Sequence, residues 1–216
     1  MNKQREGYIN GLGDNWLQRN KKNLGNNDDP VGAMFGIFKP DAVKKVLEVG
    51  CSNGWRLKRL KEKGYEVYGI DPSTNGIMEA RETTDLGADN FCIGTADKLP
   101  WPDKEFDCVI MGFCLWAIAP EDWLQVAAET DRVLRDGGAI IIHDRFSARP
   151  IRRPLPEGGM PEMYQFTYDW KKLWLSHPAY IEVAEALGVY PGTTSIEGAV
   201  MLQKNMGGRI LNGANT

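Results

Sequence analysis

The chain has 216 residues, of which 42% are hydrophobic and 25% charged, and its formal net charge is −3. This composition is typical of a globular domain, and the acidic balance disfavours a general nucleic-acid binder. The N-terminus has no apolar core, no apolar run approaches the ~20 residues of a membrane span, and the four cysteines form no Cys-x-x-Cys pair. We therefore expect a cytoplasmic protein with reduced cysteines and no metal site.

The first part of the chain is expected to be helical. Residues 14–24 predict a short helix and residues 31–38 a second helical turn, so that residues 1–40 would form an N-terminal cap or lid. From residue 44 onward strands and helices alternate. The strands are expected at 44–49, 65–70, 89–93, 105–111 and 139–143, with helices ending at Gly64, over 73–84 and from Pro120 to Arg135. This alternation predicts an α/β fold with a Rossmann-like, doubly wound, mostly parallel sheet.

The pattern changes after Asp144. Residues 145–161 are rich in arginine and proline and are interpreted as a loop, and residues 168–175 as a helix. Two final strands, 180–187 and 196–204, would form a C-terminal antiparallel pair. The main domain would thus span 41–204, followed by a flexible tail over 205–216.

The strongest motif lies directly after the first expected strand. Residues 48–54 read EVGCSNG, an E-x-G-x-x-x-G pattern in which the glycines allow a sharp turn and a close approach of the backbone to a ligand. Asp71 follows the second strand, 21 residues after Gly50, where an acidic residue can accept hydrogen bonds from ribose hydroxyls. The third strand leads into residues 94–97 (GTAD), whose acid could accept from an adenine amino group.

With residues 106–110 (FDCVI) and 132–138 (RVLRDGG), these motifs resemble the class I S-adenosylmethionine (SAM)-dependent methyltransferases of the type 11 kind over residues 44–144. The resemblance implies SAM as cofactor and S-adenosylhomocysteine as its product. It also implies a set of cofactor-binding residues: Glu48, Gly50, Cys51, Gly54, Asp71, Pro72, Thr95, Ala96, Asp97, Gly112 and Phe113. For Glu48, a hydrogen-bonded role in organising the turn is expected, because a buried, unpaired carboxylate is costly.

A nicotinamide oxidoreductase is the main competitor for the glycine turn. Its fingerprint is G-x-G-x-x-G, which brings a pyrophosphate to a helix N-terminus. Here Ser52 stands in place of the second glycine and Trp55 in place of the third. The motif therefore favours SAM over a dinucleotide.

The sequence indicates the methyl acceptor less clearly than the cofactor. Residues 111–114 read MGFC, unlike the proline-containing motifs of DNA amino and cytosine methylases of this fold, so a base-flipping enzyme is disfavoured. A looser resemblance links the later part of the chain to methyltransferases of bacterial surface-glycan and nodulation-type pathways. In that branch a histidine-rich loop would follow the fifth strand, whereas this chain has Arg145, Arg149, Arg152 and Arg153 there.

Arginine side chains bind phosphate and carboxylate well. We therefore expect Arg149, Arg152 and Arg153, with Tyr168, to bind an anionic small molecule such as a sugar or nucleotide-sugar; a solvated basic loop is the alternative. His143 and His177 are the candidate general bases, and a structural histidine at a strand end is the alternative for the first. A SAM-binding partner subunit without activity, a protein or RNA methylase, and a homodimer also remain open.

Overall fold

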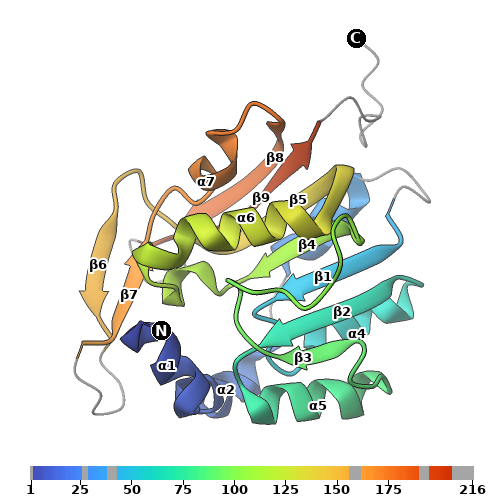
Figure 1. Cartoon of the computed structure of the whole chain (residues 1–216), viewed down its shortest axis with the longest axis vertical. Coiled ribbons are helices and arrows are strands. Elements are labelled where there is room, and N and C mark those ends of the chain that lie inside the picture. The colour runs from blue at the N-terminus through green and yellow to red at the C-terminus, as the bar shows by residue number, and fades with distance from the viewer. Residues whose placement is uncertain (1, 26–28, 38–42, 156–161, 190–194, 206–216) are drawn as a thin grey trace.

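The computed structural model describes residues 2–25, 29–37, 43–155, 162–189 and 195–205. Its centre is a seven-stranded sheet with the strand order β3-β2-β1-β4-β5-β9-β8, in which β9 is the reversed strand (Figure 1). The strands are β1 (Lys45–Val49), β2 (Glu66–Asp71), β3 (Phe91–Ile93), β4 (Phe106–Gly112), β5 (Leu134–Phe146), β8 (Tyr180–Val189) and β9 (Ile196–Lys204). The predicted fold class, including the C-terminal antiparallel pair, is thereby confirmed.

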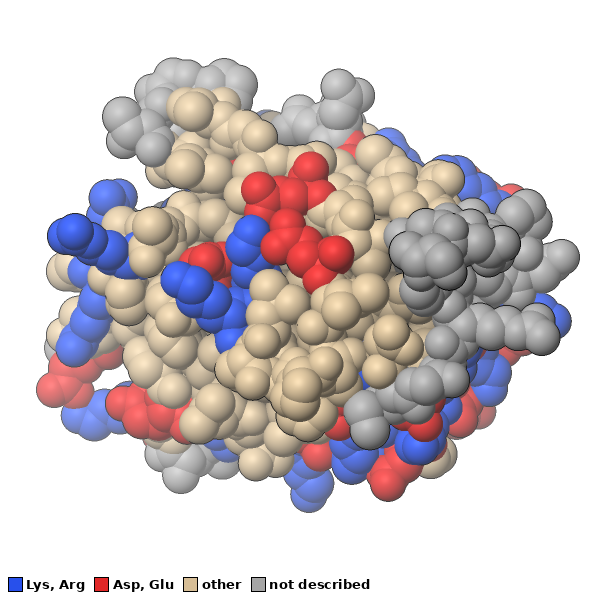
Figure 2. Space-filling model, turned by 90° about the horizontal axis from the view of Figure 1, so that it is seen from above, with Lys and Arg blue, Asp and Glu red and all other residues tan. Residues whose placement is uncertain are grey.

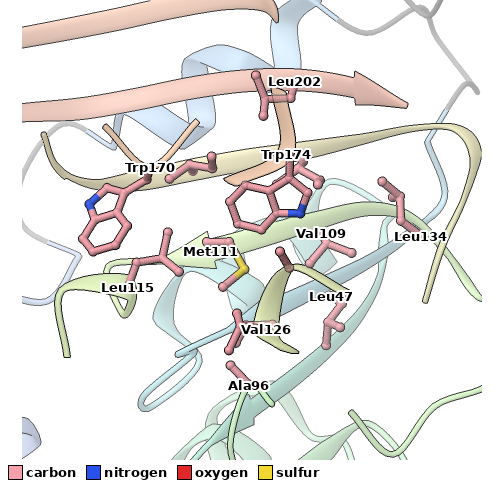
Figure 3. Packing of buried hydrophobic residues seen from close by; sticks show 14 of the residues in the cluster. Leu47, Ala96, Val109, Met111, Leu115, Val126, Leu134, Trp170, Trp174 and Leu202 are labelled. Carbon is pink, nitrogen blue, oxygen red and sulfur yellow. The ribbon is translucent and has the colours of Figure 1, made fainter. Parts of the chain in front are cut away.

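Helices cover both faces of the sheet, as doubly wound folds require. On one face, α4 (Trp55–Glu62) and α5 (Thr74–Thr84) pack their apolar side chains against alternate residues of β1, β2 and β4, and α3 (Pro30–Met34) packs over β5 and β9. On the other face lie α6 (Trp123–Val133) and α7 (Lys172–Leu175). Figure 3 shows Met111 and Val109 of β4 between Val126 of α6 and the buried rings of Trp170 and Trp174.

The N-terminal segment lies across the ends of the strands rather than on a face of the sheet (Figure 1). It consists of α1 (Lys3–Gly7), a π-helical turn (Tyr8–Leu12) and α2 (Gly13–Asn20), with a short 3-10 turn at Lys21–Asn23. The helix expected over 14–24 therefore corresponds to α2 and its extension, whereas α1 was not expected. Of the second helical segment, α3 and a 3-10 turn (Phe35–Ile37) are described, and residue 38 lies outside the described residues.

Two elements differ from the sequence prediction. The helix expected from Pro120 to Arg135 begins as a 3-10 turn (Pro120–Asp122), and α6 ends at Val133, because β5 starts at Leu134. The loop expected over 145–161 is wrong in part. Strand β5 continues to Phe146, and β6 (Ile151–Pro154) forms an antiparallel hairpin with β7 (Tyr164–Thr167).

The helix expected over 168–175 shortens to α7, because Tyr168 is extended, bridges Phe146 and stacks on the ring of Trp123. The predicted tail lies outside the described residues apart from Asn205.

Candidate cofactor site

One pocket lies at the carboxyl edge of the parallel strands, where open α/β sheets bind their ligands. Its walls come from the turn after β1, the ends of β2 and β4, the segments after β3 and β4, and the N-terminal helices. Eight of the eleven predicted cofactor residues line it: Gly50, Asp71, Pro72, Thr95, Ala96, Asp97, Gly112 and Phe113.

Two glycines let the backbone approach this pocket closely. Gly50 has a φ of +77°, and a Cβ atom there would lie 2.5 Å from the Cβ of Cys114. Gly112, at the end of β4, packs against the carboxylate of Glu48, so that any side chain would collide with it. Both positions are therefore restricted to glycine, and the backbone itself forms this wall.

Asp71 ends β2 and organises the glycine turn. Its Oδ2 accepts a hydrogen bond from the backbone N–H of Ser52 at 2.9 Å, and its Oδ1 accepts one from the N–H of Ser73 at 2.8 Å. Burial raises the pKa of this carboxyl to about 6, although both hydrogen bonds oppose the shift. A carboxylate with fixed orientation at the pocket wall is suited to accept hydrogen bonds from vicinal hydroxyls.

The segment after β3 carries a second carboxylate of the pocket lining. Asp97 lines the pocket and forms an ion pair with Arg5 of α1, with 2.7 Å between Oδ2 and Nη1. Arg5 also pairs with Asp122, which lines the same pocket. The N-terminal helix is thus fastened to the predicted adenine end of the site.

Aromatic rings form the remaining wall. Phe113, Trp116, Tyr8 and Trp16 all line the pocket, and the Tyr8 and Trp116 rings meet edge to face at 6.4 Å. The guanidinium of Arg145 lies 5.3 Å from the Phe113 ring centroid and 5.2 Å from that of Trp116. A cation or a planar group would find favourable contacts along this wall.

Glu48 does not line the pocket but lies directly behind it. It is 2% exposed and pairs with the buried guanidinium of Arg56, which also donates from Nε to both oxygens of Asp29, at 2.9 and 3.1 Å. The Nη2 of Arg56 lies 3.2 Å from Nδ1 of His143. This buried ion network, formed by Asp29, Arg56, Glu48 and His143, supports the predicted role of Glu48 in organising the turn.

The same network determines the tautomer and the charge of the His143 ring. Arginine can only donate, so Nδ1 must accept and the proton of the neutral ring lies on Nε2. Burial and the positive charge of Arg56 lower the pKa of His143 to about 3. A ring whose acceptor nitrogen is already occupied is a poor general base, which speaks against its predicted catalytic role.

We expect the His143 ring to stay neutral, with its proton on Nε2, from pH 8 to pH 5. Because an unfolded histidine gains a proton near pH 6.5, this residue should reduce the stability of the fold as the pH falls below that value. Long-range ¹H–¹⁵N spectra of the imidazole nitrogens report both the tautomer and the charge. The chain has two histidines, so a His177→Gln variant assigns the signals; a His143 titration near neutral pH would contradict the expectation.

The other predicted site residues lie outside the pocket lining. Cys51 is buried against Gly69, and Gly54 precedes α4 and packs on Ala80. His177 is exposed after α7, with its Nδ1 accepting from the N–H of Ala179. Tyr168 stacks on Trp123 at 5.7 Å between ring centroids.

The predicted acceptor arginines are exposed on and before β6. Figure 2 shows basic side chains gathered on the side of the molecule where β6 projects. Arg152 packs over the ring of Tyr164, with 3.5 Å between Cζ and the centroid, while Arg149 and Arg153 lie at the surface nearby. The arginines are thus close to one another, but none of the three lines the pocket.

Sequence reasoning missed the residues that α1, the π-helical turn and α2 contribute to the pocket: Gln4, Arg5, Tyr8, Gly13 and Trp16. The available signal was weak, because the partners lie far away in the chain; those of Gln4, for example, are 113 and 160 positions away. Within the described residues, no cluster of histidine, cysteine and acidic side chains could hold a metal ion. Among those residues there is also no helix with the length and apolar character needed to cross a membrane.

The fold is similar to that of a solved enzyme. A solved 1,6-didemethyltoxoflavin-N1-methyltransferase from Burkholderia thailandensis, with bound 1,6-didemethyltoxoflavin and S-adenosylhomocysteine, matches 93% of this chain and 90% of its own. The TM-score is 0.66 at 14% identity, which is a likeness of fold. The chain therefore shares the Rossmann-like fold of that enzyme.

Part of the chain is similar in sequence to a known family. Residues 47–142 match the methyltransferase domain family. The demethylmenaquinone methyltransferase of Staphylococcus saprophyticus is 37% identical over 101 residues, which are 45% of this chain and 42% of that enzyme. A tRNA N(3)-methylcytidine methyltransferase of Schizosaccharomyces pombe is 28% identical over 123 residues, 51% of this chain and 40% of that enzyme. The matches span less than half of either relative. Residues 47–142, less than half of the chain, are thus similar to the methyltransferase domain of class I SAM-dependent enzymes.

Proposed function

We propose that this protein transfers the methyl group of SAM to a small-molecule acceptor bound beside the aromatic wall of the pocket. The observation that carries the proposal is that one pocket joins Gly50, Asp71 and Asp97 to the rings of Tyr8, Phe113 and Trp116. The close glycine backbone and the Asp71 carboxylate are suited to hold the cofactor. SAM supplies a methyl group on a positively charged sulfur, which is already a good leaving group.

The protein's own contribution would then be positioning and the exclusion of water. The ring faces of Phe113 and Trp116 favour a positive charge nearby. Residues 1–40 would act as a cap, since Gln4 of α1 donates to the carbonyl oxygens of Ala117 and Tyr164 at 2.9 and 2.6 Å. Holding two reactants in the correct orientation provides much of the acceleration in such a transfer. The reaction therefore needs no general base from His143.

For the acceptor we infer a small planar molecule with an acidic oxygen. Of the three relatives named above, two carry the names of small fused-ring molecules, demethylmenaquinone and 1,6-didemethyltoxoflavin, and the third is named for tRNA. Arg145 does not itself line the pocket, but its guanidinium lies over the rings of Phe113 and Trp116, which do, and donates to Oε1 of Gln165 at 3.1 Å. A positive charge at this place would stabilise the anionic form of a hydroxyl and so increase its nucleophilicity.

A sugar or nucleotide-sugar acceptor is the second candidate. It is favoured by the exposed group of Arg149, Arg152 and Arg153, because arginine binds phosphate in a bidentate manner. Gln4 and Tyr164 join this hairpin to the pocket rim. The composition and the four free cysteines suit a cytoplasmic enzyme, which is part of the same proposal.

The test has two stages. Calorimetry with SAM, S-adenosylhomocysteine and NAD should show binding of the first two only. Transfer of a radiolabelled methyl group from SAM is then measured on naphthohydroquinones, nucleotide-sugars and tRNA. Labelled naphthohydroquinone supports the first acceptor class, and a labelled nucleotide-sugar that is lost in an Arg152→Ala/Arg153→Ala variant supports the second. Labelled tRNA, or binding of NAD alone, would refute the proposal.

A further inference from the structure

Arg5 of α1 connects two carboxylates of the pocket. Its Nη1 lies 2.7 Å from Oδ2 of Asp97, and its other nitrogens pair with Asp122. All three side chains are shielded, with relative exposures of 22% for Arg5 and 14% for each aspartate. An ion pair in such a partly desolvated place is held more firmly than a pair on the surface.

The helix that carries Arg5 is itself fixed. The side-chain amide of Gln4, a buried group, donates to the carbonyl oxygens of Ala117 and Tyr164, and its Oε1 accepts from the N–H of Tyr164 at 3.0 Å. Asn2 donates to Asp122 and also caps α1 by accepting from the N–H of Arg5. Arg5 is thus held from two sides, and its guanidinium can fix the rotamer of a carboxylate.

A carboxylate has two oxygen atoms, and the ion pair with Arg5 engages Oδ2 of Asp97. The other oxygen remains able to accept a hydrogen bond from a ligand in the pocket that Asp97 lines. An exocyclic amino group on a purine ring is a donor for such an acceptor, whereas a carbonyl oxygen in the same position would be repelled. Orientation of the Asp97 carboxylate therefore affects which base is accepted.

We propose that Arg5 is a positioning residue: it orients Asp97 so that its carboxylate selects the amino group of the cofactor's adenine. This inference rests on the proposed function, in which Asp97 lies at the adenine. It gives α1 a definite role, because the helix completes the base-binding part of the pocket instead of only covering it.

The experiment compares the binding of S-adenosylhomocysteine with that of S-inosylhomocysteine, in which a carbonyl oxygen replaces the amino group. Calorimetry on the full chain gives the ratio of the two affinities. We expect the wild type to prefer the adenosyl compound at least tenfold. Arg5→Gln should lower the affinity for the adenosyl compound about tenfold and bring the ratio close to one.

A matched control lies on the same helix. Lys3 pairs with Glu162 at the surface and does not line the pocket, so Lys3→Gln should leave both affinities and their ratio unchanged. Asp122→Asn removes the second partner of Arg5 without changing Arg5, and should reduce the ratio less than Arg5→Gln does. It also serves as the second variant if Arg5→Gln folds poorly.

The outcomes are distinguishable. If Arg5→Gln weakens both compounds by the same factor, or neither, the positioning role is refuted while SAM binding stands. If Asp97→Ala, which removes the acceptor, keeps the wild-type ratio of the two affinities, Asp97 does not contact the base and the inference fails. If the wild type binds neither compound, the proposed function itself is refuted.

Discussion

Replacing Arg56 with methionine is expected to lower the free energy of unfolding by about 3–5 kcal/mol, because breaking a buried ion pair leaves charges without a partner. The Arg56 guanidinium is 5% exposed and holds two carboxylates, of Glu48 and Asp29, which are 2% and 10% exposed. Its loss would also free Nδ1 of His143. Urea denaturation followed by tryptophan fluorescence measures the change, provided that the unfolding slope stays the same.

The control is Arg59→Met, three residues later on α4. Arg59 is exposed and packs on the ring of Trp55, so its replacement should cost less than about 1 kcal/mol. A second comparison is the double variant Arg56→Met/Glu48→Gln, which removes one of the stranded charges and should recover part of the loss. Equal effects of the two arginine replacements would show that the buried network contributes little.

The pH dependence of the stability of the Arg56 variant provides an independent test. Burial already raises the pKa of Glu48 to about 7 in the wild type, and without Arg56 this pKa should rise further. Glu48 of the folded variant would then hold a proton from pH 4.5 up to a value above 7, a range in which the same carboxyl of the unfolded chain has lost it. Its stability should therefore increase as the pH falls from 8 toward 5, so that the deficit relative to the wild type narrows.

The network also links stability to the cofactor pocket. Asp29 caps α3 by accepting from the N–H of Val31 at 3.2 Å, so Arg56 ties the N-terminal segment to the sheet. On its other side, Glu48 packs against Gly112, whose backbone forms the pocket wall. A loosened Glu48 would move that wall, and we expect cofactor affinity to fall together with stability in the Arg56 variant.

The parts of the fold that sequence predicted depend on short-range signals. Strands β1 and β4 are mostly apolar and buried, the glycine turn directly follows β1, and Asp71 ends β2. The β6–β7 hairpin was missed because arginine and proline dominate its first strand. In the second strand, Tyr164 and Phe166 alternate with polar residues, and this period-two pattern was the available signal.

The contacts within the site were harder to predict from the sequence than the position of the site in the fold. Because Glu48 is buried, the sequence predicts that it needs a partner, but it does not identify that partner. The partner, Arg56, lies on the next helix, and Asp29, which also pairs with Arg56, lies 27 residues before it. Arg5, on the first helix, pairs with Asp97 and Asp122, which are far from it in the sequence. Such contacts depend on how the N-terminal helices settle on the sheet edge, and nothing local in the sequence specifies that.

Asp71→Ala is expected to weaken S-adenosylhomocysteine binding by about 100-fold or more. Hydrogen bonds to a charged group contribute about 1.5–3 kcal/mol each, and two of them correspond to at least two powers of ten in affinity. The carboxylate also holds the N–H groups of Ser52 and Ser73, so its loss should loosen the turn that lines the pocket. Isothermal titration calorimetry at pH 7.5 measures the effect.

Asp107→Ala is the matched control. This carboxylate likewise accepts from two backbone N–H groups, those of Lys44 and Lys45 at 2.7 and 2.8 Å, but it lies at the amino end of β4 and outside the pocket lining. Its replacement should reduce stability without changing the affinity for S-adenosylhomocysteine. If both variants lost affinity to the same extent, the loss would reflect general loosening of the sheet and not the removal of a ligand contact.

The raised pKa of Asp71 allows a second test of the same contact. With a pKa of about 6, the carboxyl in the free protein becomes protonated as the pH falls from 7 to 5, and a protonated carboxyl accepts hydrogen bonds less well. Wild-type affinity should therefore drop through pH 6, whereas an Asp71→Asn variant, weak at every pH, should show no such step. A carboxamide cannot accept from both Ser52 and Ser73, so this variant should also bind less tightly than the wild type at pH 7.5. If the affinity of the Asp71→Asn variant still drops through pH 6, another group of the site causes the drop and Asp71 does not.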